Sequence, residues 1–264
     1  LLGLGQVYHS LFADALAAQE LPADLVYLPM ALSALNSQAA SVNGRGGLWM
    51  LTYPVALRYG LTVSATVDER HDNVRSTEAA VRYLKDLHAR YQDWSLAIMA
   101  FACGPANVTR AQQRTGGATD YRSLYPHFTE GEQEVLPLLM AFIHLHAQRD
   151  RLGLEPIVVA PHEPADTLTT GRTINLATVA QVMQLPLARL QALNPIYCSG
   201  RIPEGARFYL PRMMTACYVS MRDSLPKAEA ALERASASII EATKEQLVSV
   251  VVENRPGGGT TLGA

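Results

Sequence analysis

Apolar residues recur at helical spacing through the first 150 residues of the chain. In 6–19 they place Val7, Phe12 and Leu16 on one side of a helix, and Leu21-Pro22 follows its end. Further helices are predicted over 53–59, from a cap at Ser76, over 94–103 behind a cap at Asp93, and over 132–148. The segment 94–103 is apolar on nearly every face, so we expect it to be the central buried helix of a largely helical domain.

A polar turn interrupts this pattern between residues 27 and 50. An apolar segment runs to Leu35, a turn carries Gly44, Gly46 and Gly47, and apolar residues resume at Leu48. Glycines so close together let the backbone turn tightly or approach a ligand without a clash at Cβ. We interpret the stretch as a helix, a glycine-rich loop and a second helix, around which the rest of the domain is built.

The pattern changes after residue 150. Three prolines and no helical period predict a linker over 151–165. Beyond it the pattern predicts a strand over 166–173, helices over 176–184 and 185–195, with Asn175 capping the first and Pro186 opening the second, and a strand over 205–211. We therefore expect an α+β chain, with a mostly α-helical domain at 1–150 and a small βααβ domain at 166–220.

The last part of the chain, 221–264, has a different composition. Residues 224–244 are rich in Ala and Glu, which predicts a helix, and 246–253 are rich in β-branched residues, which predicts a strand.

Length, composition and charge narrow the class of protein. A chain of 264 residues favours two domains, and 48% hydrophobic residues suffice for a sizeable core. The net charge of −2 argues against nucleic acid or an acidic membrane as partner. No apolar run reaches the roughly 18 residues that span a bilayer. Because the chain opens on Leu1 without a signal pattern, we expect a fragment that lacks its export signal.

Histidines and cysteines show no metal-ligand spacing, so we expect no metal and no cofactor. His144 and His146 stand two apart on a predicted helix and point to different faces. Cys103 lies in an apolar run and is typical of a buried structural thiol. Cys198 and Cys217 could pair as a disulfide in an oxidising compartment.

Several short motifs in the first 150 residues occur in one order: YLP (27–29), SALN (33–36), Ser41-x-x-Gly44-x-x-Gly47-Leu48-Trp49, RYGL (58–61), VDER (67–70), STEAAVRYLKDL (76–87) and DW (93–94). Together they resemble the lytic transglycosylase domain of the membrane-bound MltD type. The resemblance implies a lysozyme-like fold that cleaves peptidoglycan glycan strands. It also implies a substrate cleft that includes Ser33, Ser41, Gly47, Trp49, Met50, Phe101 and Ala102.

The chain departs from this family where the chemistry is expected. Leu32 stands at the position of the family's acid/base glutamate, and Met50 at that of a glutamine. Phe101 and Ala102 replace a tyrosine and an asparagine, and Val135 a later tyrosine. No Asp or Glu occurs from residue 25 to residue 67. Since glycosidic cleavage needs a carboxylic acid to protonate the leaving oxygen, the acid position is vacant.

Residues 166–220 resemble a divergent LysM module, a family that binds glycans containing N-acetylglucosamine. Leu193-Asn194-Pro195 is the most characteristic motif, and Arg172 replaces the family's Asp between Gly171 and Thr173. The resemblance implies a binding groove between two turns, made of Gly171, Arg172, Thr173, Asn194, Pro195, Ile196 and Tyr197. The motif RPGGGTTLGA at the end resembles the opening of a second, truncated module.

Two functions remain open. The first is a non-catalytic pseudoenzyme of the periplasm or cell envelope, which binds peptidoglycan or serves as a scaffold for envelope proteins. The second is an active lytic transglycosylase with a relocated acid, for which Glu69 and Asp68 are the fallback candidates. Both carboxylates could instead form a structural ion pair or cap, Trp49 and Phe101 could belong to the core rather than to a sugar-stacking platform, and the LysM-like segment could be a docking domain without a glycan site.

Overall fold

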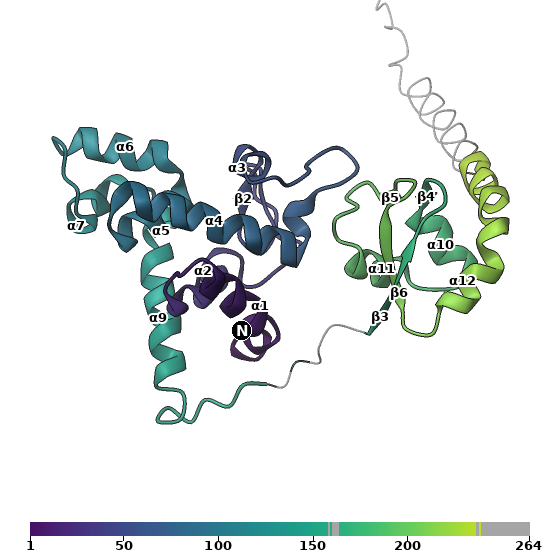
Figure 1. Cartoon of the computed structure of the whole chain (residues 1–264), viewed down its shortest axis with the longest axis horizontal. Helices are drawn as coiled ribbons and strands as arrows, with labels where there is room; N and C mark the ends of the chain where they lie inside the picture. The colour runs from purple at the N-terminus through teal and green to yellow at the C-terminus, as the bar shows by residue number, and fades with distance from the viewer. Residues whose placement is uncertain (158, 160–163, 236–237, 239–264) are drawn as a thin grey trace, which may run out of the picture. The chain divides into compact units, whose positions relative to one another are not determined.

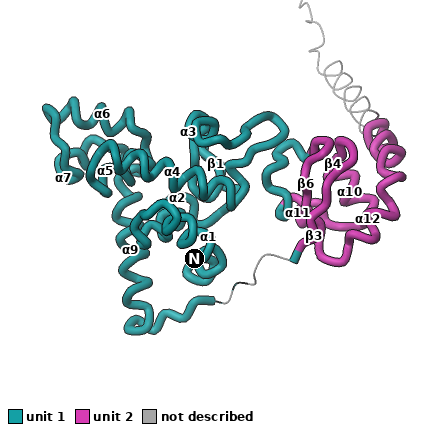
Figure 2. The backbone as a smooth tube through the Cα atoms, in the orientation of Figure 1, with its two compact units in different colours: residues 1–164, 192–200 teal, residues 165–191, 201–264 magenta. Residues whose placement is uncertain are grey.

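The computed structural model describes residues 1–157, 159, 164–235 and 238. The chain divides into two compact units, one of residues 1–164 with 192–200 and one of residues 165–191 with the chain from 201 onward (Figure 2). Each unit is described by itself. No helix among the described residues is long and apolar enough to cross a membrane.

The first unit is built from short and medium helices around one two-stranded hairpin (Figure 1). Its α-helices are α1 (Leu2–Ala18), α2 (Leu28–Ser33), α3 (Tyr53–Arg58), α4 (Asn73–Tyr91), α5 (Trp94–Cys103), α6 (Pro105–Arg114), α7 (Tyr121–Leu124), α8 (Glu130–Gln133) and α9 (Val135–Ala147). Single 3-10 turns occupy Ala23–Tyr27, Glu69–His71 and Tyr125–His127. The antiparallel strands β1 (Arg45–Gly46) and β2 (Leu51–Thr52) pair Gly46 with Leu51.

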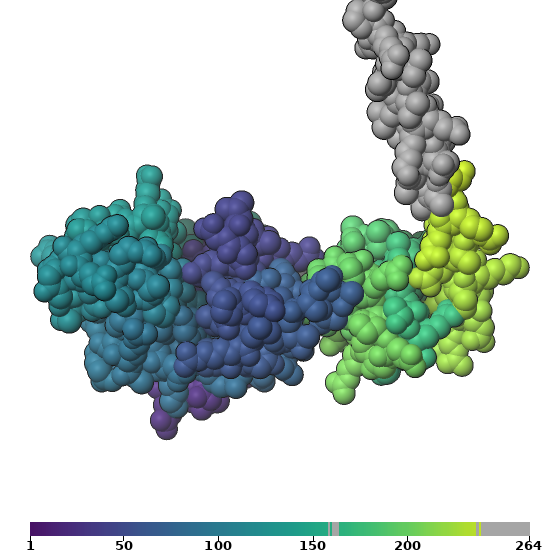
Figure 3. Space-filling view, turned by 90° about the horizontal axis from the view of Figure 1, so that it is seen from above, coloured from purple at the N-terminus to yellow at the C-terminus, as the bar shows by residue number. Residues whose placement is uncertain are grey.

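The core of this unit surrounds α5, as the sequence predicted. Every residue from Leu96 to Phe101 is buried, and the Asp93 side chain caps the helix by accepting a hydrogen bond from the Leu96 amide. Trp49 packs edge-on against Phe12 and Phe101, with ring centroids 5.3 and 6.2 Å away. Its indole Nε1 donates to Thr77 Oγ1 at 2.9 Å, so the polar atom of this ring is satisfied inside the core. On the surface, side chains close the gaps that the ribbon leaves between these helices (Figure 3).

Three predicted helix boundaries were wrong. The helix predicted from Ser76 begins at Asn73, because Asp72 caps it by accepting from the amides of Val74 and Arg75, and Ser76 lies buried within it. No helix starts at Leu48: residues 47–50 form the turn between β1 and β2. The segment 132–148 divides into α8 and α9 because a capping box at Thr129 starts a separate helical turn.

The second unit pairs four strands two by two around short helices. Strands β3 (Ala165–Thr169) and β6 (Arg207–Pro211) are antiparallel, and so are β4 (Ile174–Asn175) and β5 (Arg201–Ile202). Between them lie α10 (Leu176–Val182) and α11 (Leu187–Leu193), and α12 (Thr215–Met221) with a 3-10 turn (Arg222–Ser224) follows. Asn175 caps α10 through the Ala177 amide, as predicted. The βααβ order is therefore confirmed, with one additional strand pair.

Further predictions concern the end of the chain. The helix predicted over 224–244 is present over 225–235. The remainder of that helix, the strand predicted over 246–253 and the truncated second module lie outside the described residues.

Candidate functional site: the cleft of the first unit

Leu32 lies in the last turn of α2, directly before the glycine-rich turn. Its side chain is partly buried and packs against the hydrophobic core. The next residue, Ser33, donates from its hydroxyl to the carbonyl oxygens of Leu48 (2.7 Å) and Pro29 (3.1 Å). The helix then ends in two left-handed residues, Ala34 (φ 53°) and Leu35 (φ 61°). The position that the family resemblance gives to an acid is thus firmly held, but its side chain is apolar.

Ser41 closes the glycine-rich turn rather than pointing freely into a cleft. Its amide donates to the Arg45 carbonyl at 3.0 Å, and its hydroxyl accepts from the Arg45 amide at 3.1 Å. The Gly44 amide completes the turn by donating to the Ser41 carbonyl at 3.0 Å. The turn delivers the chain into β1 and fixes the direction in which Arg45 leaves the backbone.

The segment Asp68–His71 fastens this turn from outside. Arg70 donates through Nη1 to the carbonyl oxygens of Gly44 (2.6 Å) and Leu51 (3.2 Å), and its Nη2 forms an ion pair with Asp68 at 2.6 Å. The backbone carbonyl of Arg70 approaches Gly47 so closely that a Cβ there would collide with it, and Gly47 has a φ of +77°. We call Gly47, Asp68 and Arg70 the turn clamp.

Both fallback acids are engaged in structural contacts. Burial acts to raise the pKa of Asp68, but the hydrogen bonds and charge of Arg70 outweigh it and hold that pKa below its usual value. Glu69 accepts from the Thr62 amide at 2.6 Å and lies 3.7 Å from Arg75. A general acid needs a raised pKa, so the contacts favour the structural interpretation of these carboxylates over that of a relocated acid.

A small pocket opens between the β1–β2 hairpin and the end of α5. Met50 and Phe101, two predicted cleft residues, line it, whereas Ala102, also predicted, is partly exposed but does not line it. The full lining is Arg45, Met50, Leu51, Thr52, Val55, Tyr83, Phe101, Gly104 and Pro105. None of these nine residues is an Asp or a Glu. We call this pocket the cleft floor.

Trp49 does not belong to the cleft surface. Its side chain is 0% exposed, and Phe101 is 3% exposed, with only an edge at the cleft floor. A fully enclosed indole offers no ring face to a sugar, so the prediction that Trp49 lines the cleft is corrected: it is a core residue. The Gly-Leu-Trp motif preserves packing here.

Arg45 is the residue of the site that sequence reasoning missed. Its side chain is partly buried at the cleft floor and donates from Nη1 to the carbonyl oxygens of Met50 (3.3 Å) and Phe101 (3.4 Å). Burial lowers the pKa of this group, against smaller opposing effects of Cys103, Tyr83 and Glu132. The available signal was an arginine between two glycines of a tight turn. Arginine is rarely buried inside a fold unless it makes specific polar contacts.

The groups around Arg45 are mostly neutral at pH 7. Burial raises the pKa of Tyr83 and of the Cys103 thiol to about 12 each. Glu132 also acts electrostatically on Arg45 and Cys103, but both of its carboxylate oxygens are used. Oε1 accepts from Asn107 Nδ2 and Oε2 from the Thr129 amide, each at 2.9 Å. Cys103 is partly buried, in keeping with a structural thiol.

Each of the two turns of the predicted LysM groove takes part in hydrogen bonds. At the first turn, Arg172 donates to the Arg222 carbonyl at 3.1 Å. At the second, the amide of Tyr197 donates to the carbonyl of Asn194 at 3.2 Å, and both side chains are buried. Pro195 and Ile196 lie between them and are partly exposed. Cys198 and Cys217 are free thiols, so the proposed disulfide is absent.

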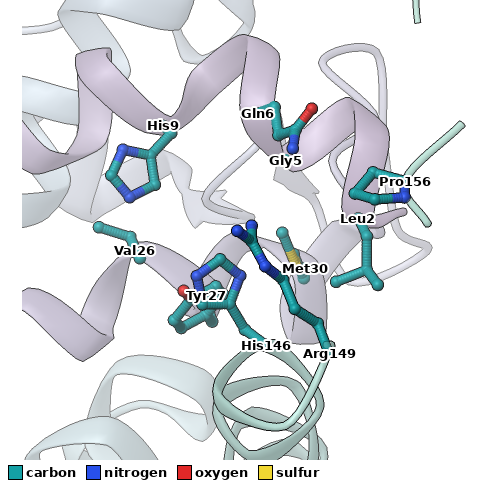
Figure 4. Close-up of a pocket in the computed structure, with 10 residues that line it drawn as sticks. All are labelled: Leu2, Gly5, Gln6, His9, Val26, Tyr27, Met30, His146, Arg149 and Pro156. Carbon is teal, nitrogen blue, oxygen red and sulfur yellow. The ribbon is translucent and has the colours of Figure 1, made fainter. Parts of the chain in front are cut away.

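A separate pocket lies between α1, the start of α2 and the end of α9 (Figure 4). His9 and Gln6 reach it from α1, and the His146 ring lies tilted against Tyr27 with ring centroids 5.1 Å apart. It shares no residue with the predicted site. No group of three metal-binding side chains occurs in the part of the chain that the structure describes.

Comparison with known proteins places both units. The transglycosylase SLT domain family matches residues 10–123, and the LysM-like domain of lytic transglycosylase MltD matches residues 165–227. Membrane-bound lytic murein transglycosylase D of Escherichia coli (strain K12) is 26% identical over 186 residues, which cover 69% of this chain and 41% of that protein. A putative tributyltin chloride resistance protein of Alteromonas sp. (strain M-1) is 36% identical over 94 residues, 35% of this chain and 45% of that one.

The chain therefore spans less than half the length of these curated relatives. Among solved structures, an inactive mutant of lytic transglycosylase Slt from Pseudomonas aeruginosa is 18% identical with a TM-score of 0.43, over 57% of this chain and 25% of that one.

Proposed function

The chain is a homologue of a membrane-bound lytic murein transglycosylase, with a lysozyme-like SLT domain followed by an MltD-type LysM-like domain, and on this premise we propose that it is a non-catalytic member that binds peptidoglycan glycan strands. The proposal places it in the periplasm or cell envelope, where peptidoglycan lies. The two domains support peptidoglycan binding. The absence of cleavage is the new part of the proposal.

Leu32 is the observation that carries the proposal. Cleavage of a glycosidic bond needs a proton delivered to the leaving oxygen, and a carboxylic acid with a raised pKa supplies it in this class of reaction. General acid catalysis is worth about 10²- to 10⁴-fold. A partly buried leucine that packs on the core cannot take part in proton transfer. The other substitutions act in the same direction, because Met50, Phe101 and Ala102 lack the amide and hydroxyl groups that orient a substrate.

The scaffold around this position is nevertheless well connected. Ser33 ties α2 to Leu48, and the turn clamp holds the glycine-rich turn. An intact cleft wall supports binding as the retained task. A second form of this proposal is that the same cleft binds envelope proteins and acts as a scaffold for them.

The alternative is an active lytic transglycosylase with an acid taken from elsewhere in the fold. Three carboxylates come into question: Asp68 and Glu69, named from sequence, and Glu132, whose charge acts on the cleft floor. Each already accepts hydrogen bonds from its own surroundings. Proton transfer to a glycan would require such a carboxyl to be protonated and free to donate.

Digestion of purified sacculi tests the proposal. We expect no release of 1,6-anhydro-muropeptides by mass spectrometry above a control without protein, while an active lytic transglycosylase run in parallel releases them. Pelleting with the same sacculi should show that the protein binds. Release that is lost in Asp68→Asn, Glu69→Gln or Glu132→Gln, but kept in the exposed control Glu134→Gln, would establish the alternative.

A further inference from the structure

The cleft floor holds a cation that forms no ion pair within the described residues. Arg45 contacts two backbone carbonyl oxygens through one of its three nitrogens, and no carboxylate within the described residues lies inside ion-pair distance of it. The two hydrogen bonds, at 3.3 and 3.4 Å, are long for a charged donor. A buried charge is normally paired, because desolvation without a partner is costly.

The groups near this charge form no ion pair with it among the described residues: only Glu132 is anionic, and it acts on Arg45 from a distance. Tyr83 lines the same pocket and keeps its proton at pH 7, as does the nearby Cys103 thiol. Glu132 is held by Asn107 and by the Thr129 amide, so its two oxygens point to α6 and the start of α8. The cleft floor therefore combines an apolar lining from Met50, Leu51 and Val55 with one guanidinium whose printed hydrogen bonds use only Nη1.

A second groove extends the positive charge along the same surface. It shares Pro105 with the cleft floor and is lined by Arg90 and Arg110, together with Ala106, Thr109 and Gln113. Arg90 lies over the ring of Tyr91, and Arg110 donates to the Asn107 side chain, so neither has a carboxylate partner in the part of the chain described. On a chain whose net charge is −2, three arginines along one connected surface are a local concentration of cations.

We propose that the cleft floor is a carboxylate-binding site in which Arg45 is the anchoring residue, and that its ligand is a muramyl unit with a free carboxylate. This inference rests on the proposed function and makes it more specific. Arginine suits the task because its planar fork can hold two carboxylate oxygens at once. A muramyl unit offers such a group on its lactyl ether or on its stem peptide, whereas N-acetylglucosamine oligomers are neutral. The cleft would then select the charged glycan by an interaction that plays no part in bond cleavage.

Binding of matched ligands to the full chain tests this proposal. Amide NMR titrations would compare N-acetylmuramic acid, its lactyl methyl ester, N-acetylmuramyl dipeptide and chitotetraose. We expect the free acid or the dipeptide to shift signals of 45–52 and 101–105 with an affinity at least about tenfold above that of the ester or of chitotetraose, as loss of one charge-assisted pair predicts. Preference between the acid and the dipeptide identifies the lactyl or the peptide carboxylate as the source.

Variants separate the role of the charge from that of the fold. Arg45→Gln should remove the preference for the charged ligand, and Arg45→Lys should keep part of it, while Arg114→Gln, an exposed arginine outside both grooves, should leave it unchanged. Thermal unfolding of each variant shows whether the fold is intact. Equal affinity for acid and ester, unaltered by Arg45→Gln, would overturn the inference while glycan binding itself stands. Absence of binding by every glycan would overturn the proposed function as well.

Discussion

The backbone carbonyl of Arg70 occupies the space that a side chain on Gly47 would need. The two residues are far apart in sequence, and their contact joins the VDER segment to the glycine-rich turn. The contact accounts for the presence of both motifs, because only a glycine at this position leaves room for the carbonyl. It also provides the most direct test of how the cleft wall is held.

Gly47→Ala should destabilise the fold strongly. The new Cβ would meet the Arg70 carbonyl, and the left-handed backbone alone costs about 1–2 kcal/mol for a non-glycine residue. We expect a total loss of about 3–5 kcal/mol in the free energy of unfolding, measured by urea denaturation. Gly44→Ala is the matched control: its φ is +73°, but nothing lies within 4 Å of the added Cβ. Equal losses in the two variants would show that the contact with Arg70 is unimportant.

The pair of Asp68 with Arg70 should make stability depend on acid pH. Because the pKa of Asp68 is lower in the folded protein than in the unfolded chain, its contribution is complete above the unfolded value of about 3.9 and disappears as the pH falls through the folded value. Asp68→Asn should therefore cost about 1–3 kcal/mol at pH 7 and little at the lowest pH at which the protein stays folded. Denaturation of both proteins across pH 3 to 7 measures this, with Asp14→Asn as the control on an exposed acid. A difference that is constant with pH would contradict the assignment.

Leu32→Glu alone should not restore cleavage. The new carboxylate would replace a side chain that packs on the core and would find no amide at Met50 and no hydroxyl at Phe101 to orient a substrate. Its desolvation should reduce the free energy of unfolding by about 1–3 kcal/mol. The sacculus assay and denaturation at pH 7 give the two readouts, and Leu32→Met is the control for altered packing. Turnover by the single variant would mean that the other substitutions matter less than we infer.

The LysM-like segment should bind N-acetylglucosamine oligomers weakly. Backbone groups of its two turns provide the hydrogen bonds in such modules, so Arg172 in place of Asp loosens the site without removing it. We expect amide shifts at 171–173 and 194–197 only at high micromolar to millimolar ligand, because one module lacks the effective concentration that a neighbour would add. Silence of both turns at saturating chitotetraose would favour the docking-domain interpretation.

The sequence predicted most of the helical framework because that framework depends on local patterns. The apolar run 94–103 could only be buried, and Asp93 and Asn175 could be recognised as caps from the residues that follow them. Ser76 was mistaken for a cap because Asp72, four residues earlier, competes for the same role and is the better acceptor. Local sequence does not decide between two such candidates.

The site was less predictable because its contacts are distant in sequence. Trp49 could stack on a sugar or fill the core, and only its hydrogen bond to Thr77 and its contacts with Phe12 and Phe101 place it inside. Arg45 reaches the carbonyl of a residue 56 positions away, which no periodicity reveals. The vacant acid, in contrast, depends on the identity of one residue, Leu32, and stays a prediction from the family resemblance.

The packing of Leu32 has a consequence for how such a protein can change over time. An acid at the end of α2 would destabilise the fold, because a carboxyl group partly buried in a hydrophobic core loses hydration. Leucine at this position avoids that cost, so under the proposed function loss of the acid would stabilise the fold. If the polar partners of the acid are also replaced, recovery of catalysis would require several simultaneous substitutions, each unfavourable by itself. The core contact of this one leucine thus stabilises the scaffold at the position where an acid would oppose folding.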